Sequence, residues 1–216
     1  MIVGSILLAF VIDASWDGSR ERAEERQALE ALAHEFRSAA DLLETQFLLT
    51  DSIVAAAETI LRWTGPNADS RYSDSLAVLL PTVSRLPGFH PPSGTLEALL
   101  GSGDLRLVEN DSLRAALASF PSQLAGMHRT EGYGSDHLFG DFRPYLNETI
   151  PMRFFGRGGD GDSRFNSDAA GVLRSLEFEN QIQSRLTNIG FLRGSIGNMR
   201  RILSDISSML DVELRR

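Results

Sequence analysis

The closing part of the chain carries the feature that most constrains its fold: a long row of side chains separated by alternate steps of four and three residues. Arg185 is the one position of this row that is not apolar. Heptad spacing of this kind predicts a helix whose apolar face is covered by another helix. That partner is either the N-terminal helix of the same chain, packed antiparallel, or a second copy of the protein. The row consists of Phe178, Ile182, Arg185, Ile189, Leu192, Ile196, Met199, Leu203, Ile206 and Leu210.

A second long helix is predicted between Arg20 and Trp63, a stretch that contains neither Pro nor Gly. Its end is predicted at Gly65-Pro66-Asn67. Only Gly18 interrupts the sequence between this helix and the apolar N-terminus, so we expect the two to be continuous. Apolar or small side chains recur in steps of three and four, at Leu29, Leu32, Phe36, Ala40, Leu43, Phe47, Thr50, Val54, Ala57 and Leu61.

Between these helices the sequence predicts shorter elements and no strand. Residues 73–86 predict two short helical turns that meet at Pro81, and the prolines at 87, 91 and 92 predict a loop. Three further helices are expected: one through Leu99 and Leu100, capped by Ser93 or Thr95 and closed by 101–103; one over 112–120, capped by Asn110 or Asp111; and one from Pro121 to Asn147. The predicted fold is therefore all-α, a long antiparallel helical hairpin capped by shorter middle helices.

The N-terminal run MIVGSILLAFVI carries no charge and is followed by Trp16, a residue that prefers the lipid headgroup level. We interpret residues 1–13 as a transmembrane anchor, with lipid contacts through residues 1–16, and residues 14–216 as a helical extramembrane domain. A cleaved signal peptide and a buried core helix are the alternatives. Twelve helical residues rise about 18 Å, which is short for a full crossing of the bilayer.

Composition excludes several chemistries. The 21 basic residues are all Arg, so a lysine nucleophile is excluded, and the absence of Cys excludes disulfides and thiolate chemistry. The formal net charge of −8 disfavours a nucleic-acid partner. No motif assembles an active site, so we predict no enzymatic activity, no catalytic or metal site and no cofactor.

Three groups of polar residues invite functional interpretation, but each has a simpler explanation. Residues 156–168 carry acidic oxygens without EF-hand spacing, which favours a mobile surface loop over a calcium site. The histidines lack ligand spacing and are expected at surfaces or interfaces. Adjacent carboxylates are expected to solvate their helices. The residues concerned are Asp160, Asp162, Asn166 and Asp168; His34, His90, His128 and His137; and the pairs Glu24 and Glu25, and Glu177 and Glu179.

Three stretches resemble a family of uncharacterised bacterial single-pass membrane proteins. They are ILLAFVIDASWDGSRERAEERQALEAL, TLEALLGSGDLRLVENDSLRAALASF and the closing helix from Glu177 to Leu214. The resemblance implies a membrane anchor and a mostly helical extramembrane domain, with no known reaction or ligand. Because members commonly carry residues before the apolar span, we expect this chain to begin late within it.

These observations predict a scaffold or protein-interaction module of the bacterial envelope. It would be a single-pass protein of the inner membrane, with the bulk of the chain in the periplasm. A partner protein or a second copy would bind along the helical seams. The alternative is a ligand-sensing helical bundle, which the glycines at 190, 194 and 197 in the last helix suggest because they permit close backbone approach or a local bend.

Overall fold

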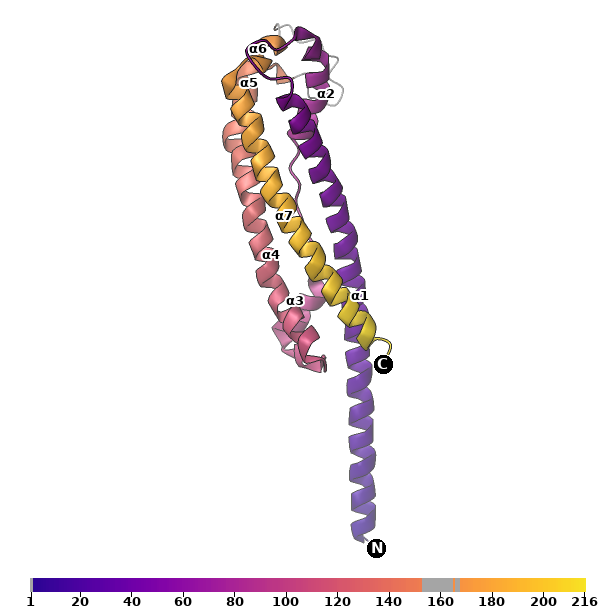
Figure 1. Ribbon diagram of the computed structural model, residues 1–216. Coiled ribbons are helices and arrows are strands. Elements are labelled where there is room, and N and C mark those ends of the chain that lie inside the picture. Colours follow the sequence, from indigo (N-terminus) through magenta and orange to yellow (C-terminus); the bar gives the residue numbers. More distant parts are fainter. Residues whose placement is uncertain (1, 153–164, 166–167) are drawn as a thin grey trace. The chain divides into compact units, whose positions relative to one another are not determined.

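The computed structural model describes residues 2–152, 165 and 168–216, and for 2–19, 21, 73 and 169 it describes the backbone alone. The described residues form helices without strands (Figure 1). The α-helices are α1 (Ile2–Leu61), α2 (Ser73–Val83), α3 (Gly94–Ser102), α4 (Asp111–His137), α5 (Arg143–Thr149), α6 (Ala169–Leu173) and α7 (Leu176–Glu213). Two 3-10 turns, η1 (Ser70–Tyr72) and η2 (Asp104–Leu107), and a π-helix, η3 (Leu138–Phe142), complete them.

The long C-terminal helix α7 confirms the predicted seam at every position. All ten residues from Phe178 to Leu210 in the heptad row are buried, and none is more than 2% exposed. Arg185 is buried as completely as its apolar neighbours. The partner that covers this face comes from the same chain, because this burial is found in a single copy.

The N-terminal helix is continuous over 60 residues, as predicted, but its buried row differs from the predicted one. Ala39, Ile53 and Ile60 are buried where the pattern placed Ala40, Val54 and Leu61, and half-buried Gln46 replaces Phe47. Adjacent rows of a helix lie only one residue apart. Apolarity barely separates Ala39, Ile53 and Ile60 from Ala40, Val54 and Leu61, and it favours Phe47 over Gln46. The observed row follows the heptad spacing of α7: Leu29, Leu32, Phe36, Ala39, Leu43, Gln46, Thr50, Ile53, Ala57 and Ile60.

The predicted boundary between anchor and domain, at residues 13 and 14, lies inside α1. The side chains of this segment lie outside the described residues. In the described part of the chain, no helix has both the length and the hydropathy needed to cross a bilayer.

The chain divides into two compact units, each built from segments distant in sequence. Unit 1 comprises Met1–Leu42, His90–Gln123 and Arg200–Arg216. In its core Phe36 of α1 meets Phe120 of α4 edge to face, with ring centroids 5.0 Å apart. The end of α7 lies near the start of the packed part of α1, because Glu25 and Leu214 line the same pocket.

Unit 2 comprises Leu43–Phe89 and Leu124–Met199. Within it α1 and α7 run antiparallel, since Asp51 contacts Arg193 and Thr64 contacts Glu179, each at 2.7 Å (Figure 1). One apolar cluster joins α1 and α2 to η3, α5, α6 and the beginning of α7. The predicted hairpin with shorter middle helices is therefore confirmed.

Two prolines lie inside helices where the sequence predicted a break. α2 continues past Pro81 to Val83, and α4 continues past Pro121 as a single helix to His137. Each proline removes one backbone donor, but the side-chain packing of the surrounding helix outweighs this loss. The predicted cap of α4 is confirmed, because Asn110 Oδ1 accepts from the backbone N–H groups of Ser112 and Leu113.

The three glycines of α7 are not sites of close approach. Gly190, Gly194 and Gly197 lie on the exposed face, and a methyl group added at any of them would meet no atom within 4 Å. They therefore weaken the helix without a packing benefit within the chain.

We expect Gly194→Ala to raise the free energy of unfolding by about 0.5–1 kcal/mol, because alanine loses less backbone entropy in a helix. Gly103→Ala is the matched control, since Gly103 has a φ of +80° at the end of α3 and should destabilise when replaced. Urea unfolding measures both. A loss of stability in Gly194→Ala would show that something contacts this face.

Candidate functional site

The connection between α2 and α3 is an extended segment without helical hydrogen bonds over most of its length. We call residues 83–89, which belong to unit 2, the strap. Val83 and Phe89 at its ends are fully buried. Buried backbone N–H and C=O groups need partners, and here no regular secondary structure supplies them.

The partners are polar side chains from α1, α4 and α7, each at a position that its heptad row otherwise gives to apolar or small side chains. Gln46 of α1 accepts from the Gly88 N–H at 3.1 Å, and Glu131 of α4 accepts from the Phe89 N–H at 2.9 Å. Arg185 of α7 donates to strap carbonyls. Glu131 belongs to a heptad row of its own, which contains Leu113, Leu117, Phe120, Leu124, Met127, Glu131, Gly134 and Leu138.

Arg185 makes the most extensive of these contacts. Its Nε donates to the Val83 carbonyl at 3.0 Å, one terminal nitrogen donates to the Arg85 carbonyl, and the other donates to the Gly134 carbonyl of α4 at 3.3 Å. Among the described residues, no carboxylate forms an ion pair with it. Burial lowers the pKa of Arg185 to about 10, so the guanidinium stays charged at neutral pH and is stabilised by carbonyl dipoles.

Phe89 is held by both of its backbone groups. Besides the bond to Glu131, its carbonyl oxygen lies 2.9 Å from Nε2 of His128, one helical turn earlier on α4. The Phe89 ring is fully buried. The strap thus places an apolar side chain in the core while α4 satisfies its main chain.

His137 lies at the end of α4, beside Arg185 and directly before the π-helix η3. Its ring stacks with that of Phe142, five residues later, at 6.2 Å between centroids. Burial lowers the pKa of His137 below its ordinary value, while the nearby charge of Asp141 raises this pKa and that of Arg185 lowers it. Nδ1 of His137 and Oε1 of Gln181 are both buried without a hydrogen-bond partner among the described residues.

In unit 1 a buried carboxylate caps α3 from across the chain. Glu35 of α1 is 8% exposed, and its two oxygens accept from the backbone N–H groups of Thr95 at 2.7 Å and Leu96 at 3.2 Å. The predicted cap, Ser93, instead donates to Glu97. No local sequence pattern indicated Glu35, because its partners are some 60 residues away.

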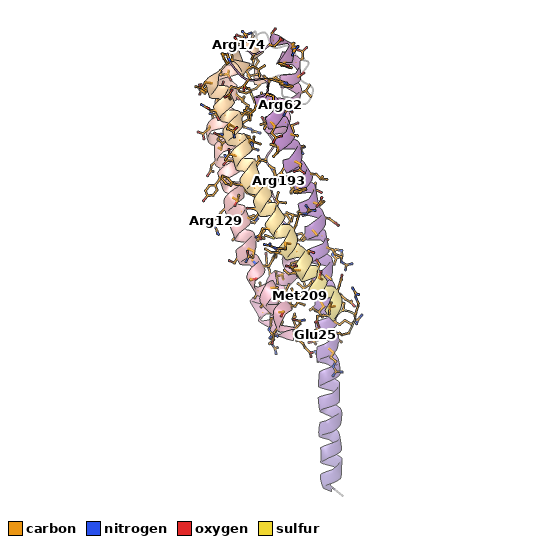
Figure 2. All side chains as sticks on the ribbon, viewed as in Figure 1. Glu25, Arg62, Arg129, Arg174, Arg193 and Met209 are labelled. Atoms are coloured by element: carbon orange, nitrogen blue, oxygen red, sulfur yellow. The ribbon has the colours of Figure 1, made fainter. Side chains whose placement is uncertain are left out.

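A preformed pocket of about 330 Å³ lies in unit 2 where α1 ends. The stacked rings of Trp63 and Tyr72, with centroids 4.9 Å apart, contribute to its wall, and Arg62 and Asp69 also line it. Its backbone is fixed by α6 and its flank: the Gly65 N–H donates to the Leu173 carbonyl, and Arg174 donates twice to the Ala68 carbonyl, at 3.1 and 3.0 Å. Figure 2 shows Arg62 and Arg174 at the same end of this unit.

The pocket in unit 1, of about 320 Å³, is lined by equal numbers of positive and negative side chains, so its charge favours no class of ligand. Three arginines and three glutamates oppose one another there: Arg22, Arg26 and Arg216 against Glu25, Glu109 and Glu213.

The other residues singled out from the sequence do not converge on one site. His34 and His90 are exposed, whereas His128 and His137 contact the strap and η3 as described. In the described residues no group of three or more His, Asp or Glu side chains could hold a metal ion. Most of the loop 156–168, with Asp160, Asp162 and Asn166, lies outside them, and Asp168 caps α6 by accepting from the Gly171 N–H at 2.7 Å.

The adjacent carboxylates do more than solvate their helices. Glu25 accepts from the Glu109 N–H at 3.0 Å, and Glu179 accepts from the Thr64 hydroxyl at 2.7 Å. Each therefore joins two segments within its own unit. Glu24 forms an exposed ion pair with Arg20, as its surface position predicts.

Comparisons with known proteins add no family to this description. No family model, no curated protein and no solved structure matches the chain.

Proposed function

We propose that the protein is a membrane-anchored helical interaction module of the bacterial envelope. Residues 1–13 would enter the inner membrane, and the rest of the chain would present a partner-binding surface in the periplasm. The proposal is supported most directly by α1, which runs as one helix from Ile2 to Leu61. If the membrane held the apolar start of α1, the continuous helix would also fix the orientation of the packed residues that follow it.

The seams themselves offer little free surface to a partner. The apolar face of α7 is covered within one chain, so a second protein would reach it only after α7 had separated from its neighbours. We therefore place partner binding elsewhere on the described surface.

The pocket at the end of α1 has the composition of an interaction hot spot. Trp, Tyr and Arg are the residue types that dominate binding energy at interfaces, and this pocket contains Trp63, Tyr72 and Arg62. Its fixed backbone lowers the entropy cost of binding. Asp69 pairs with Arg71, whereas Arg62 forms no ion pair among the described residues, so the pocket suits a partner side chain that brings a carboxylate.

Membrane fractionation tests the anchor. We expect the tagged full-length protein to remain in the pellet through high-salt and alkaline carbonate washes, to dissolve in detergent, and to keep its uncleaved mass. A variant lacking residues 1–13 is the matched control and should be recovered in the supernatant, because the described core begins only at Leu29. Release of the full-length protein by carbonate, or a mass reduced by cleavage, would contradict anchoring.

Site-specific cross-linking in whole cells tests the pocket. A photoreactive side chain at the exposed Asn67 should give a discrete adduct, which Arg62→Glu abolishes by reversing the charge of the pocket. Arg129→Glu, an exposed substitution on α4 of the same unit, should leave the adduct unchanged (Figure 2). An adduct that survives Arg62→Glu, or the absence of any adduct, would contradict the assignment.

A further inference from the structure

The outer face of α2 is apolar, where a surface helix normally carries polar side chains. Seven of the eight residues at 76–83 are apolar. One side of the helix is covered by unit 2, since Leu76, Leu80 and Val83 are at most 2% exposed. On the opposite side Val78 is 72% exposed. A helix that is apolar all round is normally covered on every side, so the open face of α2 indicates a docking surface.

Two charged residues mark the ends of this face. Asp74 lies in the first turn of α2, and Arg85 follows the end of the helix, where its N–H donates to the Thr82 carbonyl at 3.1 Å. Both are exposed, and neither forms an ion pair with any residue that the structure describes. Asp74, Val78 and Arg85 are separated by steps of four and seven residues, so these positions follow one line along the helix.

An acid at one end and a base at the other make this face complementary to a copy of itself turned end to end. A twofold axis pairs residue i of one copy with residue j of the other, and j with i. Asp74 lies five positions before residue 79, and Arg85 lies five positions after residue 80. Antiparallel packing centred there would therefore place Asp74 of each copy opposite Arg85 of the other. Val78 of each copy would lie opposite Pro81 of the other, so the apolar positions would also meet.

We propose that the outer face of α2 is a contact between two copies of this chain, packed antiparallel about a twofold axis. The contact uses none of the residues that line the pocket at the end of α1, and it does not depend on membrane anchoring. Antiparallel packing also brings opposite ends of the two helix dipoles together.

The length of α2 sets the strength of this contact. The helix has 11 residues and is therefore about 17 Å long. A helix of this length covers less than the roughly 800 Å² per partner that stable complexes bury. We therefore expect a weak dimer, with a Kd in the micromolar range.

Charge reversal tests the twofold arrangement in the full-length protein, kept in solution by a mild detergent. In Asp74→Arg alone, and in Arg85→Asp alone, both ion pairs of the dimer become pairs of like charge. We expect sedimentation velocity to show dimerisation weakened at least about tenfold in each variant. An equimolar mixture of the two variants should dimerise as the wild type does, because each copy then meets the opposite charge at both ends of the face.

Val78→Asp tests the apolar part of the contact. We expect it to weaken dimerisation at least about tenfold, because it places a charge at the centre of the buried face. Leu48→Asp is the matched control, since Leu48 of α1 is 61% exposed in the same unit and should leave the dimer unchanged. Urea unfolding of each variant checks that the fold is retained.

Three outcomes would overturn the proposal. One is a wild-type protein that remains monomeric up to about 1 mM. Another is a dimer that persists in Asp74→Arg, or that mixing the two charge variants does not restore, which would place the contact on another face. The third uses the absence of cysteine from the chain, which gives a single labelling site in Val78→Cys. An environment-sensitive dye there that responds to phosphatidylcholine vesicles, and not to protein concentration, would assign the face to lipid.

Discussion

The architecture of unit 2 depends on how the main chain of the strap is satisfied. An extended segment enters the core with Phe89, and its backbone groups are met by Gln46 of α1, Glu131 of α4 and Arg185 of α7. Each of these residues takes a position that the heptad rows otherwise give to apolar or small side chains. These polar residues in the heptad rows thus specify where the strap lies. Buried polar residues set the register of paired helices in a similar way.

Burying these polar groups around the strap costs free energy. A buried guanidinium loses its hydration, and three carbonyl oxygens replace water without supplying a full negative charge. Nearby, His137 and Gln181 leave two buried atoms without partners. Polar groups of this kind are strongly stabilising when satisfied and strongly destabilising when one partner is removed or its charge changes.

The sequence predicted the helices well and the polar contacts poorly, for a physical reason. On α7 nine of the ten positions in the row are apolar and the alternating steps of four and three continue without a break, so all ten positions were correct, including Arg185 as the exception. On α1 the true and the predicted rows differ little in apolarity, since Ala39, Ile53 and Ile60 are followed by Ala40, Val54 and Leu61, while the polar Gln46 is followed by Phe47. The strap contacts join residues 39 or more positions apart, and Glu35 caps α3 from 60 positions away. Helical periodicity reports local burial and contains no information about such pairs.

The most direct test of this account is the unfolding free energy of Arg185→Met, measured in urea beside Arg193→Met, an arginine of the same helix that is half exposed and paired with Asp51. Methionine fits a seam position, so apolar packing alone would leave Arg185→Met unchanged or more stable. If Arg185 holds the strap, its replacement leaves buried carbonyl oxygens without a hydrogen-bond donor. The free energy of unfolding then falls by about 3 kcal/mol or more, against less than about 1 kcal/mol for the control. Equal or greater stability in Arg185→Met would contradict the central role of this contact.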